Sequence, residues 1–239
     1  MSLAGNAERL GVDITGKWWS GGQPVLGAIQ FTLSVGEIVA IAGPSGCGKS
    51  TLMGILAGHD KDYQGRVLWC GQPRMGIVFQ SPRLLPWRTA TQNVALALGG
   101  GRTAQRLARE ALAEVGLDDA ADTYPARLSV GMARRVAFAR ALVAEPDVLL
   151  LDEAFVSLDD AAADGLRAIV LAAIEGRGMS VLMISHDTRE SEEMANRLLV
   201  LGGSPARLVA EHRMNQGRGA AERPTFFPAG SRFRRNNEE

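Results

Sequence analysis

Residues 43–51 have the residue types and spacing of a loop that binds phosphate groups. They read Gly43, Pro44, Ser45, Gly46, Cys47, Gly48, Lys49, Ser50 and Thr51. Glycines let the backbone curl so that its N–H groups point at phosphate oxygens, and a following helix adds partial positive charge. Lys49 is expected to reach the β- and γ-phosphates of a nucleotide, and the Ser50 hydroxyl to bind Mg²⁺. Cys47 is interpreted as a small filler, because phosphoryl transfer needs no covalent intermediate.

A pair of carboxylates follows the apolar run 148–151. Asp152 and Glu153 close this run, and ligands of open α/β sheets bind beyond the carboxyl ends of the strands. We therefore expect Asp152 to hold Mg²⁺ beside Ser50 and Glu153 to polarise an attacking water. Adjacent acids more usually mark a helix start, but a buried strand and a phosphate loop favour the catalytic interpretation. His186 ends a similar run, where a γ-phosphate could be sensed.

Two kinds of segment must position these residues. Continuous apolar runs, typical of a parallel sheet covered on both faces, lie at 37–42, 75–79, 148–151 and 181–184. Segments with helical spacing of apolar residues lie at 50–57, 103–115, 131–144 and 159–174. Further strand-like pieces, expected to form an antiparallel flank, lie at 29–33, 66–70, 198–201 and 207–210.

This alternation predicts an α/β fold with a mostly parallel sheet, an antiparallel β flank and an inserted helical lobe at about 84–144. Together with the phosphate loop at 43–51, it predicts a P-loop NTPase core. We expect one domain over residues 1–211. Residues 212–239 are rich in Gly, Arg and Asn with little periodicity, which predicts a flexible tail.

The composition excludes several classes of protein. Lys and Arg number 26 and so do Asp and Glu, which gives a net charge of zero, and aromatic residues are only 5%. Neither value favours binding to nucleic acid. The two cysteines, Cys47 and Cys70, cannot form a framework of several disulfides. The sequence shows no apolar run long enough to span a bilayer, and its start is not that of a signal peptide.

Five further features make the chain similar to the ATP-binding cassette (ABC) ATPase family over nearly its whole length. Residues 128–142, LSVGMARRVAFARAL, resemble the family's signature motif and the helix after it, and Ser129 lies 23 residues before Asp152. Four other positions match further motifs of the family. Gln80 matches the Q-loop glutamine, residues 157–159 the D-loop, His186 the switch histidine and Trp19 the aromatic residue that stacks on adenine. Trp18 is the alternative for the last position.

The resemblance implies a head-to-tail dimer that holds two ATP molecules between its subunits. In one subunit, Lys49, Gln80, Glu153 and His186 would serve catalysis, and Ser50, Gln80 and Asp152 would bind Mg²⁺. Ser129 and Gly131 of the second ATPase subunit would complete the γ-phosphate site, with Asp159 at the same interface. Val130 and Met132 depart from the commonest signature, which has Gly and Gln there, and are interpreted as a tolerated variant.

Residues 80–89 resemble the Q-loop extension of importers for nitrate, sulfonate, taurine and related small anions or heteroaromatic compounds. In that group this region docks a permease helix, so Leu84, Leu85 and Trp87 are expected to line a docking groove. The alternative is that they pack inside the helical lobe. The resemblance implies that the protein lies on the cytoplasmic side of the cell membrane, attached through transmembrane permease subunits. It would work indirectly with a periplasmic or extracellular solute-binding protein.

Other functions explain the sequence less well than an importer does. A stand-alone P-loop kinase or small GTPase would not explain Ser129 or His186. A soluble ABC protein that acts on DNA or ribosomes would usually carry two cassettes or a long coiled-coil insertion. The runner-up is the ATPase of an exporter or a lipid-trafficking ABC system.

Overall fold

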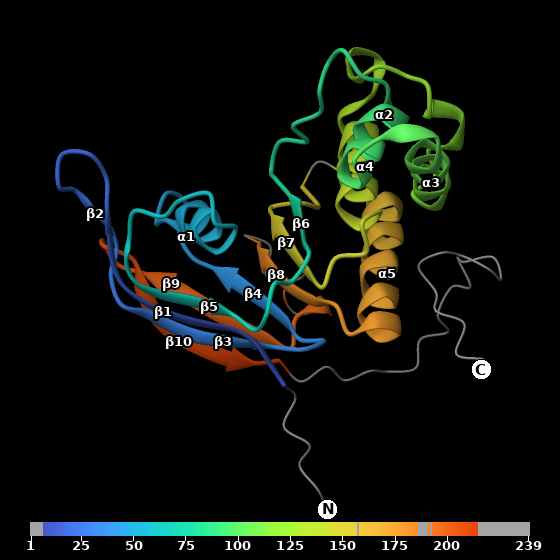
Figure 1. Cartoon of the computed structure of the whole chain (residues 1–239). Coiled ribbons are helices and arrows are strands. Elements are labelled where there is room, and N and C mark those ends of the chain that lie inside the picture. The colour runs from blue at the N-terminus through green and yellow to red at the C-terminus, as the bar shows by residue number, and fades with distance from the viewer. Residues whose placement is uncertain (1–6, 157, 186–190, 192, 215–239) are drawn as a thin grey trace, which may run out of the picture. The chain divides into compact units, whose positions relative to one another are not determined.

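The computed structural model describes residues 7–156, 158–185, 191 and 193–214. The chain forms two compact units, which Figure 1 shows with their elements labelled. The first unit takes the chain up to Pro73, Leu150–Glu153 and the described residues from Ser180 onward. The second unit takes Arg74–Leu149 and Ala154–Met179.

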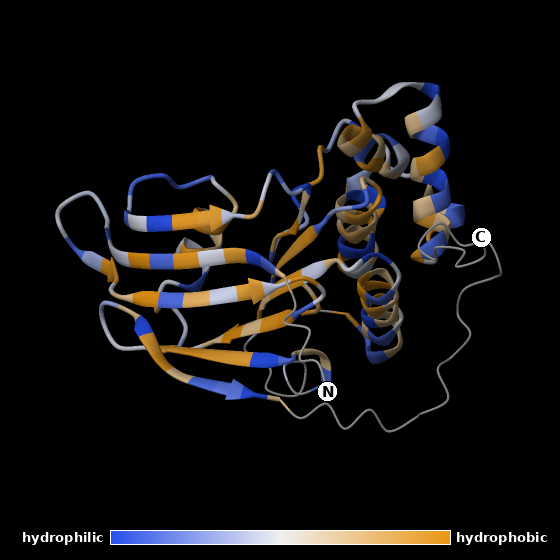
Figure 2. Ribbon diagram, turned by 60° about the horizontal axis from the view of Figure 1, so that its bottom comes forward, coloured by the Kyte–Doolittle hydropathy of each residue, from blue (hydrophilic) through white to orange (hydrophobic). Residues whose placement is uncertain are grey.

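An antiparallel sheet forms one part of the first unit. Strand β1 (Glu8–Trp18) pairs with β2 (Pro24–Leu26), β3 (Ile29–Ser34) and β5 (Gln64–Trp69), all antiparallel. Alternate residues of β1 and β3 are buried, as expected where one face of a sheet is solvated. Figure 2 shows the matching alternation of hydrophobic and hydrophilic residues along these strands. Neither β1 nor β2 was among the strands predicted from the sequence.

A second sheet carries the predicted parallel core. The strands of this sheet that lie wholly or partly in the first unit follow the order β10 (Arg207–Arg213), β9 (Arg197–Gly202), β4 (Ile38–Ala42), β8 (Ser180–Ile184) and β7 (Val148–Asp152). Strand β4 runs parallel to both β8 and β9. Strands β4, β7 and β8 are buried almost throughout, which confirms the interpretation of their continuous apolar runs.

Two predictions about the end of this sheet need correction. Residues 198–201 lie in β9, which pairs parallel with β4, so they belong to the core and not to an antiparallel flank. Only β10 is antiparallel there, to β9. Strand β10 ends at Arg213, two residues beyond the expected boundary at 211. The single domain over 1–211 and the tail over 212–239 otherwise stay a prediction.

The second unit is mainly helical. Its main elements are β6 (Met75–Val78), α2 (Ala90–Ala95), α3 (Gly101–Glu114), α4 (Val130–Leu142) and α5 (Asp160–Arg177). Short 3₁₀ turns lie at Leu96–Leu98, Asp118–Ala120 and Pro125–Arg127. The helices α2, α3 and α4 contact one another and lie within residues 84–144, where the helical lobe was predicted. Helix α2 itself was not predicted.

Strand β6 differs from its predicted full burial, because Met75 at its start is exposed. The strand approaches α4 closely at Gly76, where a Cβ atom would lie 2.6 Å from the Ala141 carbonyl oxygen. Only a residue without a side chain leaves that distance free of a clash. In the described part of the chain, no helix combines the length and apolar character that crossing a membrane requires.

Candidate functional site

The phosphate loop connects β4 to helix α1 (Lys49–Leu56) in the first unit. Gly43 has φ 155° and Gly48 has φ 106°, in the region that favours glycine. A Cβ atom would lie 2.6 Å from the Leu201 carbonyl oxygen at Gly43 and 2.7 Å from Leu26 Cδ2 at Gly48. Both the backbone angles and the close neighbours therefore require glycine at these two positions.

The N-terminus of α1 offers hydrogen-bond donors to an anion. Gly48 is the N-cap and supplies no capping side chain, and the first N–H groups of a helix have no partner within the helix. Lys49 is buried, and its Nζ donates to the carbonyl oxygens of Gly43 and Pro44, both at 2.8 Å. The ammonium is thus held inside the curl of the loop, where it suits the binding of phosphate.

A cavity of about 480 Å³ joins this loop to Trp19. The residues around it are Trp19, Gln23, Pro24, Val25, Pro44, Ser45, Gly46, Cys47, Gly203, Ser204 and Ala206. Trp19 is 50% exposed and lines this cavity, so a flat ligand in the cavity can reach its ring. Trp18 does not line the cavity. Its ring covers Gly16, where a Cβ atom would lie 2.2 Å from the Trp18 ring.

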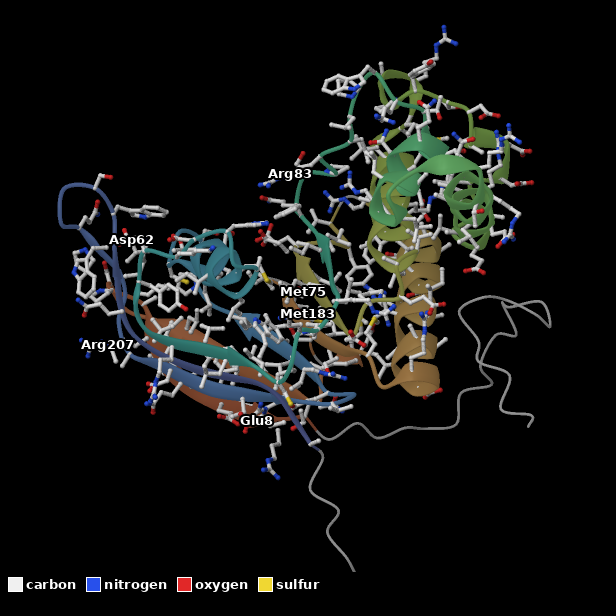
Figure 3. The ribbon with its side chains drawn as sticks, viewed as in Figure 1. Glu8, Asp62, Met75, Arg83, Met183 and Arg207 are labelled. Atoms are coloured by element: carbon white, nitrogen blue, oxygen red, sulfur yellow. The ribbon has the colours of Figure 1, made fainter. Side chains whose placement is uncertain are left out.

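Lys17 supports the position of Trp19. Its Nζ lies 4.9 Å from the centroid of the Trp19 ring and bonds to carboxylate oxygens of Asp60 and Asp62 at 3.0 and 3.2 Å; Figure 3 labels Asp62. Burial alone would lower the pKa of Lys17, but its hydrogen bonds to the two carboxylates raise that pKa. The side chain therefore stays charged beside the ring, as a cation–π contact requires.

The carboxylates lie at the end of β7, also in the first unit. Asp152 is the last residue of the strand. Glu153 follows at φ 48°, and its N–H donates to the Ile184 carbonyl oxygen at 3.0 Å. Ile184 pairs with Ile41 of β4, two residues before Gly43. This register places Glu153 at the same end of the sheet as the phosphate loop.

The backbone at Glu153 is strained. A residue with a Cβ atom costs about 1–2 kcal/mol in the left-handed region, and such positions cluster at functional sites. A Ser50 hydroxyl and an Asp152 carboxylate are the kind of hard oxygen ligand that Mg²⁺ prefers. His186 lies outside the residues that the structure describes.

The second unit carries the other predicted site residues. Ser129 is the N-cap of α4, and its Oγ accepts the Met132 N–H at 3.1 Å. Asp159 is the N-cap of α5, and its carboxylate accepts the Ala162 N–H at 2.9 Å. Gly131 lies in the first turn of α4. Ser157 falls outside the described residues.

The expected docking segment wraps around one buried side chain, that of Asn93. Asn93 Oδ1 accepts the Leu85 N–H at 2.8 Å, and its Nδ2 donates to the carbonyl oxygens of Leu85 and Arg88 at 3.2 and 3.0 Å. Trp87 is 69% exposed. The alternative that Trp87 packs inside the helical lobe is therefore wrong, whereas Leu84 and Leu85 are half-buried.

Sequence reasoning missed several residues that hold these segments. Asn93 shapes residues 85–89, and Arg134 and Arg140 donate to carbonyl oxygens of residues 80–83. The cavity wall also includes Gln23, Pro24 and the turn at Gly203 and Ser204. These contacts join residues far apart in the chain, so no local pattern of residue spacing predicts them.

Comparisons with known proteins agree on one family. The family model described as "ABC transporter" matches residues 26–156. The aliphatic sulfonates import ATP-binding protein SsuB 2 of Burkholderia cenocepacia (strain HI2424) is 39% identical over 89% of this chain and 84% of its own length. The taurine import ATP-binding protein TauB of Shigella flexneri is 40% identical over 83% of this chain and 82% of its own length. The dimeric, ADP- and Pi-bound structure of the ATP-binding cassette MJ0796 has a TM-score of 0.78 and 26% identity, covering 87% of this chain and 98% of that one.

Proposed function

The chain belongs to the ABC transporter family and binds and hydrolyses ATP, and we propose that it is the subunit that powers an importer for a small sulfonate- or taurine-like solute. In the structure, the cavity that joins Trp19 to the phosphate loop supports the binding of a nucleotide. Relatives about 40% identical over most of the chain, both named for import, support the transport half. They favour import over the exporter or lipid-trafficking alternative.

Within one subunit, each side chain has a separate task. Lys49 and the N–H groups of the loop neutralise and orient the phosphates, and Trp19 stacks on the adenine. Ser50 and Asp152 would hold Mg²⁺, which would neutralise charge on the phosphates. The role of Gln80 at Mg²⁺ and in catalysis stays a prediction from the sequence. Glu153 accepts a proton from the attacking water, and His186 contacts the γ-phosphate.

The second ATPase subunit completes the site. Ser129 and Val130 are exposed at the start of α4, so this end of the helix is free to meet a nucleotide held by another copy. The Ser129 hydroxyl accepts the Met132 N–H, which leaves its proton to donate to a phosphate oxygen. Asp159 lies at the same dimer interface. Closing this interface excludes water and assembles the catalytic set.

The membrane partner is a permease that docks on residues 84–87. Trp87 is an exposed aromatic residue on a segment whose backbone Asn93 fixes, and aromatic anchors carry much of the binding energy of an interface. Through the permease the subunit would sit at the cytoplasmic face of the membrane. A solute-binding protein outside the membrane would deliver the cargo.

Uptake in cells that carry this gene tests the whole proposal. Deleting the gene should abolish ATP-driven uptake of radiolabelled taurine or a short alkanesulfonate, and the wild-type gene should restore it. Trp87→Ala should fail to restore uptake while the purified variant hydrolyses ATP normally. Uptake that is unchanged by the deletion, with export of another compound lost instead, would overturn import.

A further inference from the structure

Arginine side chains of helix α4 donate hydrogen bonds to carbonyl oxygens of residues 80–83, the segment that follows β6. Arg134 Nη2 donates to the Gln80 carbonyl oxygen at 2.6 Å. Arg140 donates to the carbonyl oxygens of Pro82 and Arg83 at 2.8 and 2.9 Å. Arg83, labelled in Figure 3, has φ 46° and places its guanidinium 3.8 Å from the centroid of the Phe79 ring. Three of the four carbonyl oxygens of residues 80–83 thus depend on arginines of one helix.

The same helix also holds the segment that follows Glu153. Arg134 Nη1 donates to the Ala154 carbonyl oxygen at 3.2 Å. Phe138 lies one turn further along α4 on the same face, and its ring centroid is 5.3 Å from that of Phe155. Arg134 is only 5% exposed, so its bonds to these two segments are protected from water and cannot be replaced easily by solvent.

We propose that Arg134 is a positioning residue that ties Gln80 and the residue after Glu153 to the helix that begins at Ser129. A planar guanidinium has five donors in a fixed fork, so one arginine can hold two backbone oxygens at a set separation. Any movement of the start of α4 then moves both the Gln80 backbone and the Ala154 carbonyl. This inference rests on the proposed catalytic roles of Gln80 and Glu153.

Arg134→Lys tests the fork without removing the charge. An ammonium on a flexible stem cannot hold both oxygens in the same geometry, so we expect kcat for ATP hydrolysis by the full chain to fall about tenfold, the lower end of what is typical when a supporting residue is lost. The dissociation constant for ATP should stay within about twofold, because the substitution keeps the charge at position 134 and leaves every residue of the phosphate loop unchanged. The matched control is Arg135→Lys: Arg135 donates to the carbonyl oxygens of Val115 and Gly116 at the end of α3, and its loss should leave kcat unchanged.

A double-variant cycle separates positioning from a general loss of structure. Arg134 is proposed to act through Gln80 as well as through Glu153, so Arg134→Lys should cost clearly less in a Gln80→Ala background than in the wild type, with the remaining loss due to Glu153. All rates are measured well below the melting temperature of each variant. A lower melting temperature with an unchanged kcat would overturn the proposal, and so would equal losses in both backgrounds.

The failure of this inference is distinguishable from the failure of the proposed function. If Gln80→Ala and Glu153→Gln both leave turnover intact, the assigned catalytic roles are wrong whatever Arg134 does. If both lower turnover and Arg134→Lys behaves like Arg135→Lys, only the positioning role is wrong.

Discussion

The two units expose their functional groups by different means. In the first unit the backbone conformation positions the functional groups. The features that do so are the glycines of the loop, the uncapped start of α1 and the strained residue Glu153 after β7. In the second unit side chains hold backbone: Asn93 shapes residues 85–89, and Arg134 and Arg140 hold residues 80–83. Local sequence spacing is therefore enough to find the first set, and long-range contacts are needed for the second.

This difference predicts where substitutions act. A change in the first unit should remove a charge or a donor from the nucleotide, with a direct effect on binding or chemistry. A change in the second unit should displace a segment and act through geometry or stability. The variants below test that division, from the largest expected effect to the smallest.

Glu153→Gln should lower steady-state ATP hydrolysis by about 10²- to 10⁴-fold, the usual value of a general base. Binding of ATP should persist and an ATP-bound dimer should accumulate, because the phosphate loop is untouched. Single-turnover hydrolysis and size-exclusion chromatography with ATP measure the two effects. Glu145→Gln is the matched control, since Glu145 also has a positive φ, 51°, but lies in the second unit beside Arg177. Normal turnover in Glu153→Gln would remove Glu153 from its catalytic role.

Lys49→Ala should weaken the binding of ATP by about 10- to 100-fold, since hydrogen bonds to charged groups are worth about 1.5–3 kcal/mol. Isothermal titration calorimetry measures the affinity directly. Lys61→Ala, at an exposed position of the same unit, should leave it unchanged. An equal loss in both variants would mean that net charge, and not the contact of Lys49 with the loop, sets the affinity.

The parallel core could be predicted because its signals are local. Strands β4, β7 and β8 are buried on both faces and show as unbroken apolar runs. Strand β1 was missed although Leu10, Val12 and Ile14 are buried in it, because a half-solvated strand alternates with polar residues and gives a weaker pattern. Helix α2 was missed as a separate element because six residues are too few to show a helical period.

The site could be predicted in part for a related reason. The loop 43–51 and the pair Asp152 and Glu153 are continuous in sequence, so their spacing identified them. The wall of the cavity at Gly203 and Ser204 meets the loop only after the sheet has folded. Arg134 and Asn93 could not be told from ordinary residues of helical segments. Their partners are backbone carbonyl oxygens, which every residue has, so the sequence does not show which residues they bind.

Gly76→Ala tests the close packing of the second unit. Its Cβ would meet the Ala141 carbonyl oxygen at 2.6 Å, and overpacking of this kind costs about 1–3 kcal/mol. Thermal unfolding should therefore begin several degrees lower, with little change in ATP affinity. Gly165→Ala in α5 is the control: nothing lies within 4 Å of its Cβ position, so it should stabilise the helix by about 0.5–1 kcal/mol. A destabilised Gly165→Ala would show that glycine is needed there for another reason.

The smallest effect is expected from the adenine platform. Trp19→Ala should weaken ATP binding by about 0.5–1.5 kcal/mol, the range for aromatic stacking beyond burial, which is roughly two- to tenfold. Trp18→Ala should do less, because the Trp18 ring covers Gly16 and does not line the cavity. Tryptophan fluorescence assigns the contact independently of affinity: quenching by nucleotide should survive Trp18→Phe and disappear in Trp19→Phe. The reverse result would move the stacking role to Trp18 and require the end of β1 to turn when nucleotide binds.

Because stacking does not recognise the edge of the base, the affinity for GTP should fall by about the same factor as the affinity for ATP in Trp19→Ala. A loss confined to ATP would instead point to a hydrogen bond from the cavity wall to adenine.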